Sequence, residues 1–433
     1  MATVKAIGIV GMGDMGKLYA RRFAQAGYTV YASDISARYD ELCAEYSNSE
    51  SIKILKNGIQ VARLADLLLF SVEAENIESA TSQIAPSAKP GAIIGGQSSC
   101  KSIEVEALAK YAPDDCEIIC LHSMHSASVD PQGQPLIVVP FRVFDHKSST
   151  AQLTDICATT FGSRIAVLSA SEHDRITAAT QAATHAAFLA MGSAWLANNQ
   201  YPWVIGRYAG GIENVKINIS LRIFSSKWHV YAGLAIYNPA AHEQILQYSR
   251  SVTELFTLFI QGDKETLRSR LYNVRDTLFS PERSQSHKLL LSDDLLDEYS
   301  LSTVPKDERT PNSHLSLLAV GDCWYRLGIN PFDHMICSTP IFRILIGVTE
   351  YVFATSLLDD AINTGINDHS FRHDDLEFTL AARSWADVVA AGSFDLYKHR
   401  FEKVSQFFVP QKDDALAVGN KMIQKILHHT TTS

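Results

Sequence analysis

The 433-residue sequence lacks several features that define particular classes of protein. It has no run of eighteen apolar residues, which argues against a membrane-spanning helix. None of its seven cysteines belongs to a C-x-x-C pair, which argues against a zinc site. It also lacks a basic excess: its net charge is -9, whereas nucleic-acid-binding domains are usually basic. These absences predict a protein that binds no metal, no membrane and no nucleic acid.

The N-terminus and the thiols indicate the compartment. The first residues, MATVKAIGIVG, have no long apolar core before a cleavage site, and an odd number of cysteines without a leader is typical of reduced thiols. Hydrophobic residues make up 46% of the chain, as in globular proteins, and the length suits two or three domains. We therefore expect a cytoplasmic protein that acts on a small molecule.

Three glycines near the N-terminus predict a dinucleotide-binding loop. Gly11, Gly13 and Gly16 follow the apolar run at 6–10 and precede a helical pattern, and a second apolar run then ends at Asp34. Such a loop needs one glycine for the tight turn, one for close approach of the pyrophosphate and one for helix packing. The residues predicted to contact the cofactor are Gly11, Met12, Gly13, Asp14, Met15, Gly16 and Asp34.

Asp34 bears on the choice of cofactor. An acid at this place usually accepts hydrogen bonds from the ribose 2′-hydroxyl of NAD and repels the 2′-phosphate of NADP. Ser36 and Arg38 follow closely, and both can bind a phosphate. The residues alone favour NAD without excluding NADP.

Further apolar runs predict the rest of the first domain. They lie at 67–72, 92–95, 117–121 and 136–144, separated by helical or polar stretches. This alternation is typical of a doubly wound parallel sheet, a Rossmann α/β domain, which we expect to extend to residue 165. Ligands bind beyond the carboxyl ends of such strands, where this chain has GGQSSCK (95–101) and LHSMHSAS (121–128).

Four segments together resemble the prephenate and arogenate dehydrogenases of the TyrA type. They are SVEAENI, GGQSSCK, LHSMHS and EHDRITAATQAATHAAFLA, in the family's order and at similar spacing. The resemblance covers roughly residues 6–280 and is closest in character to the fungal branch, which is described as NADP-dependent. It therefore implies NADP, whereas Asp34 favours NAD.

The resemblance implies the catalytic residues. The family's base is a His that is followed by Pro after the sixth strand, and His122 occupies that place, with Ser123 where the Pro usually stands. His125 is an alternative. The family's Ser that orients the base and the nicotinamide corresponds to Ser99, with Ser98 as a near alternative. A histidine titrates near neutral pH and suits removal of a hydroxyl proton.

The resemblance also implies a reaction. It is the oxidative decarboxylation of prephenate to 4-hydroxyphenylpyruvate, with hydride transfer to NADP, in the tyrosine branch of aromatic amino-acid biosynthesis. The enzyme would be an oxidoreductase of the CH–CH, decarboxylating type. Aromatisation of the ring drives the reaction, so no metal is expected. Inhibition by tyrosine is left open.

Substrate-binding residues are expected on the second domain. The resemblance implies that His185 faces the substrate, and we add Lys101 and Arg383 as candidates for binding it. An arginine suits a substrate carboxylate, because its guanidinium can bind both oxygens. The sequence does not decide which arginine does so among Arg222, Arg250, Arg343 and Arg383. His173 and Asp174, which precede His185, are expected to support the contact between domains.

The second half of the chain repeats itself. Residues 184–195 (THAAFLAMGSAW) recur as 313–324 (SHLSLLAVGDCW), shifted by 129 positions, and Gly262 recurs as Gly392. We also align 220–235 with 340–355, which sets Arg222 against Arg343. The pattern predicts a tandem helical unit, with copy 1 at 166–285, a linker at 286–312 and copy 2 at 313–433.

The duplication suggests how the chain assembles. Short-chain relatives are homodimers joined through helical second domains, so two copies in one chain could form a monomer with an internal pseudo-dimer, although a homodimer is possible. The alternatives in function are arogenate dehydrogenase and a non-catalytic NAD(P)-sensing protein. A hydroxyacid dehydrogenase is disfavoured, since 173–190 lacks the lysine that those enzymes use.

Overall fold

The computed structural model describes residues 4–144, 149–208, 210–280, 310–333, 338–370 and 372–411, with single positions at 305, 308, 417, 418 and 421. The chain divides into two compact units, Met1–Thr177 and Ala178–Ser433. The predicted boundary at 165/166 comes too early, because helix α7 (Ala170–Thr177) packs against α5 (Lys101–Tyr111) of the first unit. The predicted linker, 286–312, lies mostly outside the described residues.

The first unit is built on one eight-stranded sheet in the order β3-β2-β1-β4-β5-β6-β7-β8. The strands are buried apolar runs of four to eight residues, apart from the short β3. Their bounds are β1 Ala6–Val10, β2 Thr29–Ser33, β3 Ile52–Ile54, β4 Leu67–Phe70, β5 Ile93–Gly96, β6 Glu117–Ser123, β7 Pro135–Arg142 and β8 Arg164–Val167.

The prediction of a parallel sheet is wrong for one strand pair. The strands from β3 to β6 pair in parallel, as predicted, but β7 is antiparallel to β6, and β8 is parallel to β7. The connection 124–134 contains no helix that could carry the chain back to the other end of the sheet, so the strand returns directly.

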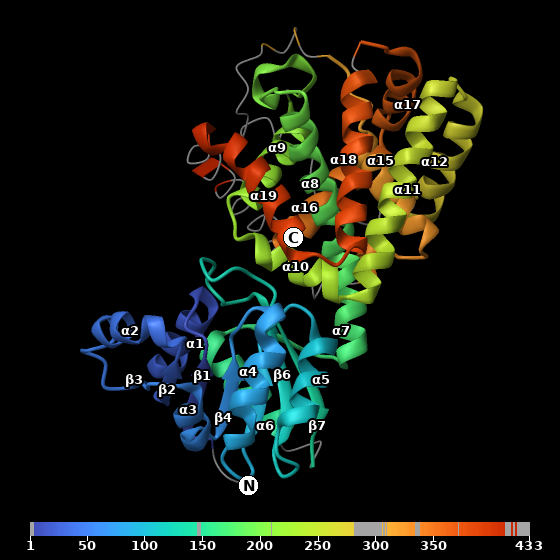
Figure 1. The fold of residues 1–433 in the computed structure, drawn as a ribbon. Helices are drawn as coiled ribbons and strands as arrows, with labels where there is room; N and C mark the ends of the chain where they lie inside the picture. Colours follow the sequence, from blue (N-terminus) through green and yellow to red (C-terminus); the bar gives the residue numbers. More distant parts are fainter. Residues whose placement is uncertain are drawn as a thin grey trace. The chain divides into compact units, whose positions relative to one another are not determined.

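Helices cover both faces of this sheet (Figure 1). α3, α4 and α5 pack together on one face, and α1 and α6 pack together on the other. Tyr19, Phe23 and Phe161 join their rings between α1 and α6 in the core. The helices not yet given are α1 Asp14–Gln25, α2 Tyr39–Glu45, α3 Gly58–Leu64, α4 Ile77–Ile84 and α6 Ser149–Phe161.

The second unit is helical throughout its described residues, around one core that contains four of the chain's buried tryptophans. Helices α11 and α18 lie side by side in Figure 1 and pack along each other. The main helices are α8 Ala183–Ala197, α9 Gly211–Phe224, α10 Trp228–Tyr237, α11 Pro239–Gln261, α12 Lys264–Leu278, α15 Leu315–Arg326, α16 Pro340–Ala354, α17 Leu357–Asn367, α18 Arg372–Ala390 and α19 Phe394–Phe407.

Two glycines in this unit occupy matching surroundings. A Cβ atom on Gly192 of α8 would meet the ring of Phe224, and one on Gly321 of α15 would meet the ring of Phe353. Both pairs are separated by 129 positions. The predicted pairing of Arg222 with Arg343 is therefore wrong, since the same offset sets Arg222 against Tyr351.

The packing of the helices is reciprocal at this offset. Helix α8 packs on α18 and α19, while α15 packs on α11 and α12. Helix α10 packs on α19, and α17 packs on α12. Gly262 and Gly392, both with left-handed backbone, end α11 and follow α18. Each helix of the first run thus contacts the second run in the way that its counterpart contacts the first.

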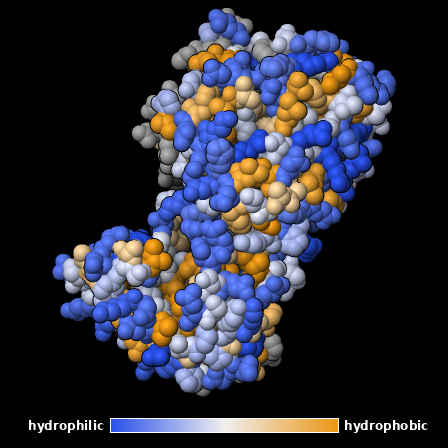
Figure 2. Space-filling model, in the orientation of Figure 1, coloured by the Kyte–Doolittle hydropathy of each residue, from blue (hydrophilic) through white to orange (hydrophobic). Residues whose placement is uncertain are grey.

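The surface agrees with this distribution of apolar side chains. Figure 2 shows hydrophilic and hydrophobic residues interspersed over the visible face of each unit. Within the described residues, no single helix has the length and composition of a membrane span; Ile341–Ala354 and Leu357–Asn367, bent by 81°, meet that test only as a pair.

Candidate active site

The glycine loop between β1 and α1 has the geometry that a dinucleotide needs. Gly11 has φ +98°, and a Cβ atom there would collide with the carbonyl oxygen of Ser71. A Cβ on Gly16 would collide with the carbonyl oxygen of Gly11, so helix and loop touch directly. A Cβ on Gly13 would meet nothing within 4 Å. The open space before the α1 N-terminus fits a pyrophosphate, and α1 begins at Asp14.

Asp34 is already engaged by its own surroundings. Its Oδ2 accepts hydrogen bonds from the backbone N–H of Met12 and from Arg38, both at 2.7 Å, and its Oδ1 accepts from the N–H of Ile35. Arg38 also donates to the Met12 carbonyl. The carboxylate therefore holds the glycine loop against the end of β2 and is paired with a cation, which removes the basis for repelling a 2′-phosphate.

The segment GGQSSCK forms a tight turn at the end of β5. A Cβ on Gly95 would collide with the Ile119 backbone, and one on Gly96 with the carboxylate of Glu104. That carboxylate forms an ion pair with Lys101, and both side chains are fully buried. The placement of Lys101 does not support the prediction that it binds substrate, because its ammonium is enclosed beneath the turn and paired.

The two serines of the turn differ in accessibility. The Ser98 hydroxyl donates to the Cys100 carbonyl at 2.6 Å, and the Ser98 N–H donates to Glu104. Ser98 is buried, whereas Ser99 is partly exposed. This difference favours Ser99 over Ser98 as the residue that faces a ligand.

His122 lies near the carboxyl end of β6 and is 8% exposed. Its Nδ1 lies 2.7 Å from Nε2 of His173 on α7, and the two rings meet edge to face at 5.0 Å. Burial, followed by the nearby charges of His173 and Lys101, holds the pKa of His122 well below its usual value. The imidazole is therefore neutral at neutral pH and can accept a proton.

Asp174 stands behind this histidine pair. Its Oδ1 lies 2.8 Å from Nδ1 of His173. The carboxylate also accepts hydrogen bonds from the backbone N–H groups of Lys101 and Ser102 and from the Ser102 hydroxyl, at the N-terminus of α5. Burial opposes ionisation, but these bonds outweigh it and lower the pKa of Asp174. Asp174 is thus a fixed anion at a helix N-terminus.

The sequence interpretation missed the role of this pair. His173 and Asp174 were expected to support a contact between domains, whereas the structure joins them to His122 within the first unit. A signal was present, since an adjacent His-Asp pair in EHDRIT can orient another imidazole. His125, the alternative base, is bonded instead to the Ser126 carbonyl at 2.9 Å.

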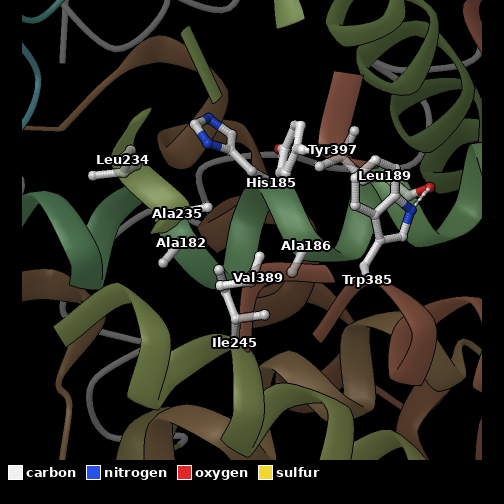
Figure 3. Close-up of a pocket in the computed structure, with 10 residues that line it drawn as sticks. All are labelled: Ala182, His185, Ala186, Leu189, Leu234, Ala235, Ile245, Trp385, Val389 and Tyr397. Carbon is white, nitrogen blue, oxygen red and sulfur yellow. Dashed lines mark hydrogen bonds between the residues drawn. The ribbon is translucent and has the colours of Figure 1, made fainter. Parts of the chain in front are cut away.

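His185 lines a pocket within the second unit. Figure 3 shows it among the side chains of α8, α10, α11, α18 and α19, and the pocket encloses about 290 Å³. The His185 ring meets Tyr231 edge to face at 4.8 Å, and burial lowers the pKa of His185 to about 3. The lining residues are Ala182, His185, Ala186, Leu189, Leu234, Ala235, Ile245, Trp385, Val389 and Tyr397.

The four candidate arginines lie in different surroundings. Arg250 and Arg383 are exposed on α11 and α18 and do not line this pocket. Arg343 donates to the Ser338 hydroxyl at 2.9 Å. Arg222, near the end of α9, is partly buried and interacts with Tyr231, the residue that contacts His185. Arg222 is thus the arginine of the four with a neighbour at the pocket.

Comparisons with known proteins agree with this geometry. Residues 6–117 match the NAD-binding domain of 6-phosphogluconate dehydrogenase, and residues 182–428 match the 6-phosphogluconate dehydrogenase C-terminal domain. A solved A. aeolicus prephenate dehydrogenase with hydroxyphenyl propionate and NAD+ has a TM-score of 0.51 at 17% identity, over 66% of this chain and 99% of that one. That likeness supports the fold.

Two curated relatives match almost end to end. The probable prephenate dehydrogenase (NADP+) of Schizosaccharomyces pombe is 51% identical over 98% of this chain and 98% of its own length. The prephenate dehydrogenase (NADP+) of Saccharomyces cerevisiae is 48% identical over 99% of this chain and 95% of its own length. With such identity over nearly its whole length, the chain belongs to the prephenate dehydrogenase family.

Proposed function

We infer that this chain is an NADP-dependent prephenate dehydrogenase, which converts prephenate to 4-hydroxyphenylpyruvate and carbon dioxide. The observation that carries the inference is the His122–His173–Asp174 chain at the end of β6, in a protein about half identical to enzymes of that name. The reaction serves the tyrosine branch of aromatic amino-acid biosynthesis.

The hydrogen bonds assign the proton positions. The Asp174 carboxylate can only accept, so Nδ1 of His173 carries a proton and its Nε2 is an acceptor. His122 then donates through its own Nδ1 to His173, which leaves a lone pair on Nε2 of His122. Thr177 does not compete as a donor, because its hydroxyl donates to the His173 carbonyl at 2.7 Å.

These positions suit the first chemical step. Nε2 of His122 takes the proton from the ring hydroxyl of prephenate, while the hydride leaves the carbon that bears this hydroxyl. NADP, when bound, accepts that hydride. The bond to the ring carboxylate breaks, its electron pair enters the ring, and carbon dioxide departs as the ring becomes aromatic. The Asp174 anion stabilises the imidazolium that forms at His122 by way of His173.

The proposed cofactor preference rests on Arg38. Its Nη1 holds Asp34, and its Nη2 lies 3.4 Å from the exposed Glu41, so the guanidinium stays at the end of β2. This is the end at which a Rossmann domain meets the ribose. We place the 2′-phosphate of NADP beside Arg38 and Ser36.

We assign one substrate carboxylate to Arg222 and the adjacent contact to His185. Arg222 interacts with Tyr231, whose ring packs against His185, so the three side chains form one group at the pocket. A neutral His185 can donate or accept a hydrogen bond without adding charge. Ser99 is proposed to orient the nicotinamide and His122.

We also propose that the second unit is an internal pseudo-dimer formed by tandem duplication. Its support is the offset of 129 or 130 positions between the two runs of helices, the matched Gly192–Phe224 and Gly321–Phe353 packing, and the reciprocal helix contacts. Such a chain would be active as a monomer.

The test of the reaction is a direct assay. The protein is mixed with prephenate or arogenate and with NADP or NAD, and the absorbance of the reduced cofactor is followed. Rapid reduction of NADP with prephenate is expected. Turnover with arogenate alone, or with no pair, would refute the assignment. Sedimentation of the active enzyme at assay concentration tests assembly, where an obligate dimer would contradict the internal pseudo-dimer.

A further inference from the structure

Two arginines at equivalent positions of the helical unit have opposite surroundings. Arg270 on α12 and Arg400 on α19 are separated by 130 positions. Arg270 binds both oxygens of Asp322, at 2.7 and 2.6 Å, and Glu254 at 2.8 Å. Asp322 is fully buried, so this guanidinium is neutralised where it lies.

At Arg400 both acids are missing. The positions equivalent to Asp322 and Glu254 are Ser193 and Ser384. The Arg400 guanidinium donates to the Ser384 hydroxyl, its Nε is buried without a hydrogen-bond partner, and no carboxylate among the described residues lies within ion-pair distance. Only Asp387, which is exposed, acts on it through space. Desolvation consequently lowers the pKa of Arg400.

Arg400 belongs to the wall of the His185 pocket. Its guanidinium lies 5.0 Å from the ring centre of Trp385, and Trp385 packs edge-on against Tyr397 at 4.9 Å. Both rings line the pocket, as Figure 3 shows. Trp385 is held by hydrogen bonds from its Nε1 to the Leu189 carbonyl and the Ser193 hydroxyl. An uncompensated cation therefore lies beside an aromatic pocket.

The equivalent histidines show the same contrast. His314, 129 positions after His185, lies 3.2 Å from Glu213 and 3.3 Å from Lys216 in a buried cluster of charges. His185 instead lines the pocket and packs against Tyr231. Each locus thus pairs a histidine from one copy with an arginine from the other, but only one locus leaves both side chains without a carboxylate among the described residues.

We propose that Arg400, supplied by the second helical copy, recognises a carboxylate of the substrate in the His185 pocket, and that the equivalent locus of His314 and Arg270 binds none. This rests on the proposed function, because prephenate carries two carboxylates and Arg222 accounts for one. A guanidinium that has lost its internal acids can bind a carboxylate of the ligand in their place. The locus with Arg270 has no such vacancy, since Asp322 and Glu254 take its donors.

The experiment compares Michaelis constants for prephenate. Arg400→Gln is expected to raise KM about tenfold to hundredfold, the loss of a charged hydrogen-bonded pair, with Arg400→Lys in between. Ser384→Glu restores the acid found at Glu254 and should raise KM equally while leaving the melting temperature unchanged or higher. Arg270→Gln, the matched control, should lower the melting temperature and leave KM unchanged.

The decisive results are distinct. A wild-type KM in both Arg400→Gln and Ser384→Glu would overturn the proposal, as would an equal rise in Arg270→Gln. If Arg270→Gln does not fold, the partly exposed Arg326→Gln beside the same Asp322 serves as control. In the variants, the KM for NADP should stay at the wild-type value, because the cofactor loop lies in the first unit.

A binding measurement separates this proposal from the proposed reaction. All five tryptophans lie in the second unit, so their fluorescence reports ligands there. The probes are 4-hydroxyphenylpyruvate and its neutral analogue 4-hydroxyphenylacetone. Loss of the preference for the acid in Arg400→Gln assigns the side-chain carboxylate; an unchanged preference with a raised KM for prephenate assigns the ring carboxylate. Without turnover in the wild type the reaction fails, and an unchanged preference then refutes Arg400 as well.

Discussion

Nδ1 of His122 lies 2.7 Å from Nε2 of His173, although the two residues are 51 positions apart and belong to a strand and a helix. The contact sets the tautomer of the proposed base, because the anion of Asp174 orients His173 from the other side. The strand end, α7 and the α5 N-terminus thus act together on one nitrogen atom, and a change at any of them should affect proton transfer.

Replacement of His122 by Asn should lower kcat by about a hundredfold to ten-thousandfold, the usual contribution of general base catalysis. The side chain keeps a similar size but cannot take up a proton at neutral pH. Turnover of prephenate measures the loss, and NADP binding should be unchanged. His125→Asn is the matched control, and a larger loss there would transfer the role to His125.

Asp174→Asn should alter the pH profile as well as the rate. The anion raises the pKa of His122, so its removal lowers that pKa further and moves the acid limb of kcat/KM to lower pH. The variant should also be less stable, since the α5 N-terminus loses its charged acceptor. Ser102→Ala, which removes one donor and keeps the anion, should leave the acid limb in place. An acid limb that stays in place in Asp174→Asn as well would separate Asp174 from the base.

The sequence predicts this site unevenly. The glycine loop and the parallel strands are local patterns of glycines and apolar runs, so they could be found directly. The burial of Lys101 could not, because it depends on Glu104 and on the space left by Gly96 across the turn. The antiparallel β7 depends on a connection without a helix, which composition does not reveal. Arg222 and Arg343 were misaligned because apolar helices resemble one another, and only the Phe224 packing corrects the offset.

Arg38→Gln should change cofactor preference. Loss of the guanidinium removes the proposed partner of the 2′-phosphate and leaves Asp34 without its cation, so repulsion adds to the lost bond. KM for NADP should rise about tenfold to hundredfold, whereas KM for NAD should change little. Arg63→Gln, an exposed arginine on α3, is the control. Equal effects on both cofactors would place the phosphate elsewhere.

The internal pseudo-dimer predicts that equivalent changes have equivalent costs. Gly192→Ala and Gly321→Ala each force a methyl group against a buried phenylalanine ring and should destabilise the helical unit by about 1–3 kcal/mol. Urea unfolding followed by tryptophan fluorescence measures both, since all five tryptophans lie in this unit. A large cost at one glycine and none at the other would contradict matched packing. Gly328→Ala, at a surface turn, tests ordinary backbone strain separately.

Buried neutral histidines should make the helical unit sensitive to acid. The pKa of His185 is lowered to about 3, so between pH 6.5 and that value the unfolded chain binds a proton that the folded chain does not. The free energy of unfolding therefore falls as pH falls through this window, by about 1.4 kcal/mol per pH unit and by at most about 5 kcal/mol from His185. His185→Phe should reduce this slope by one proton, measured by urea unfolding at pH 4.5 to 6.5, whereas the exposed His399→Gln should not. A slope unchanged in His185→Phe would mean that the ring is protonated in the folded protein, and its role as a neutral hydrogen-bonding partner for the substrate would fall with it.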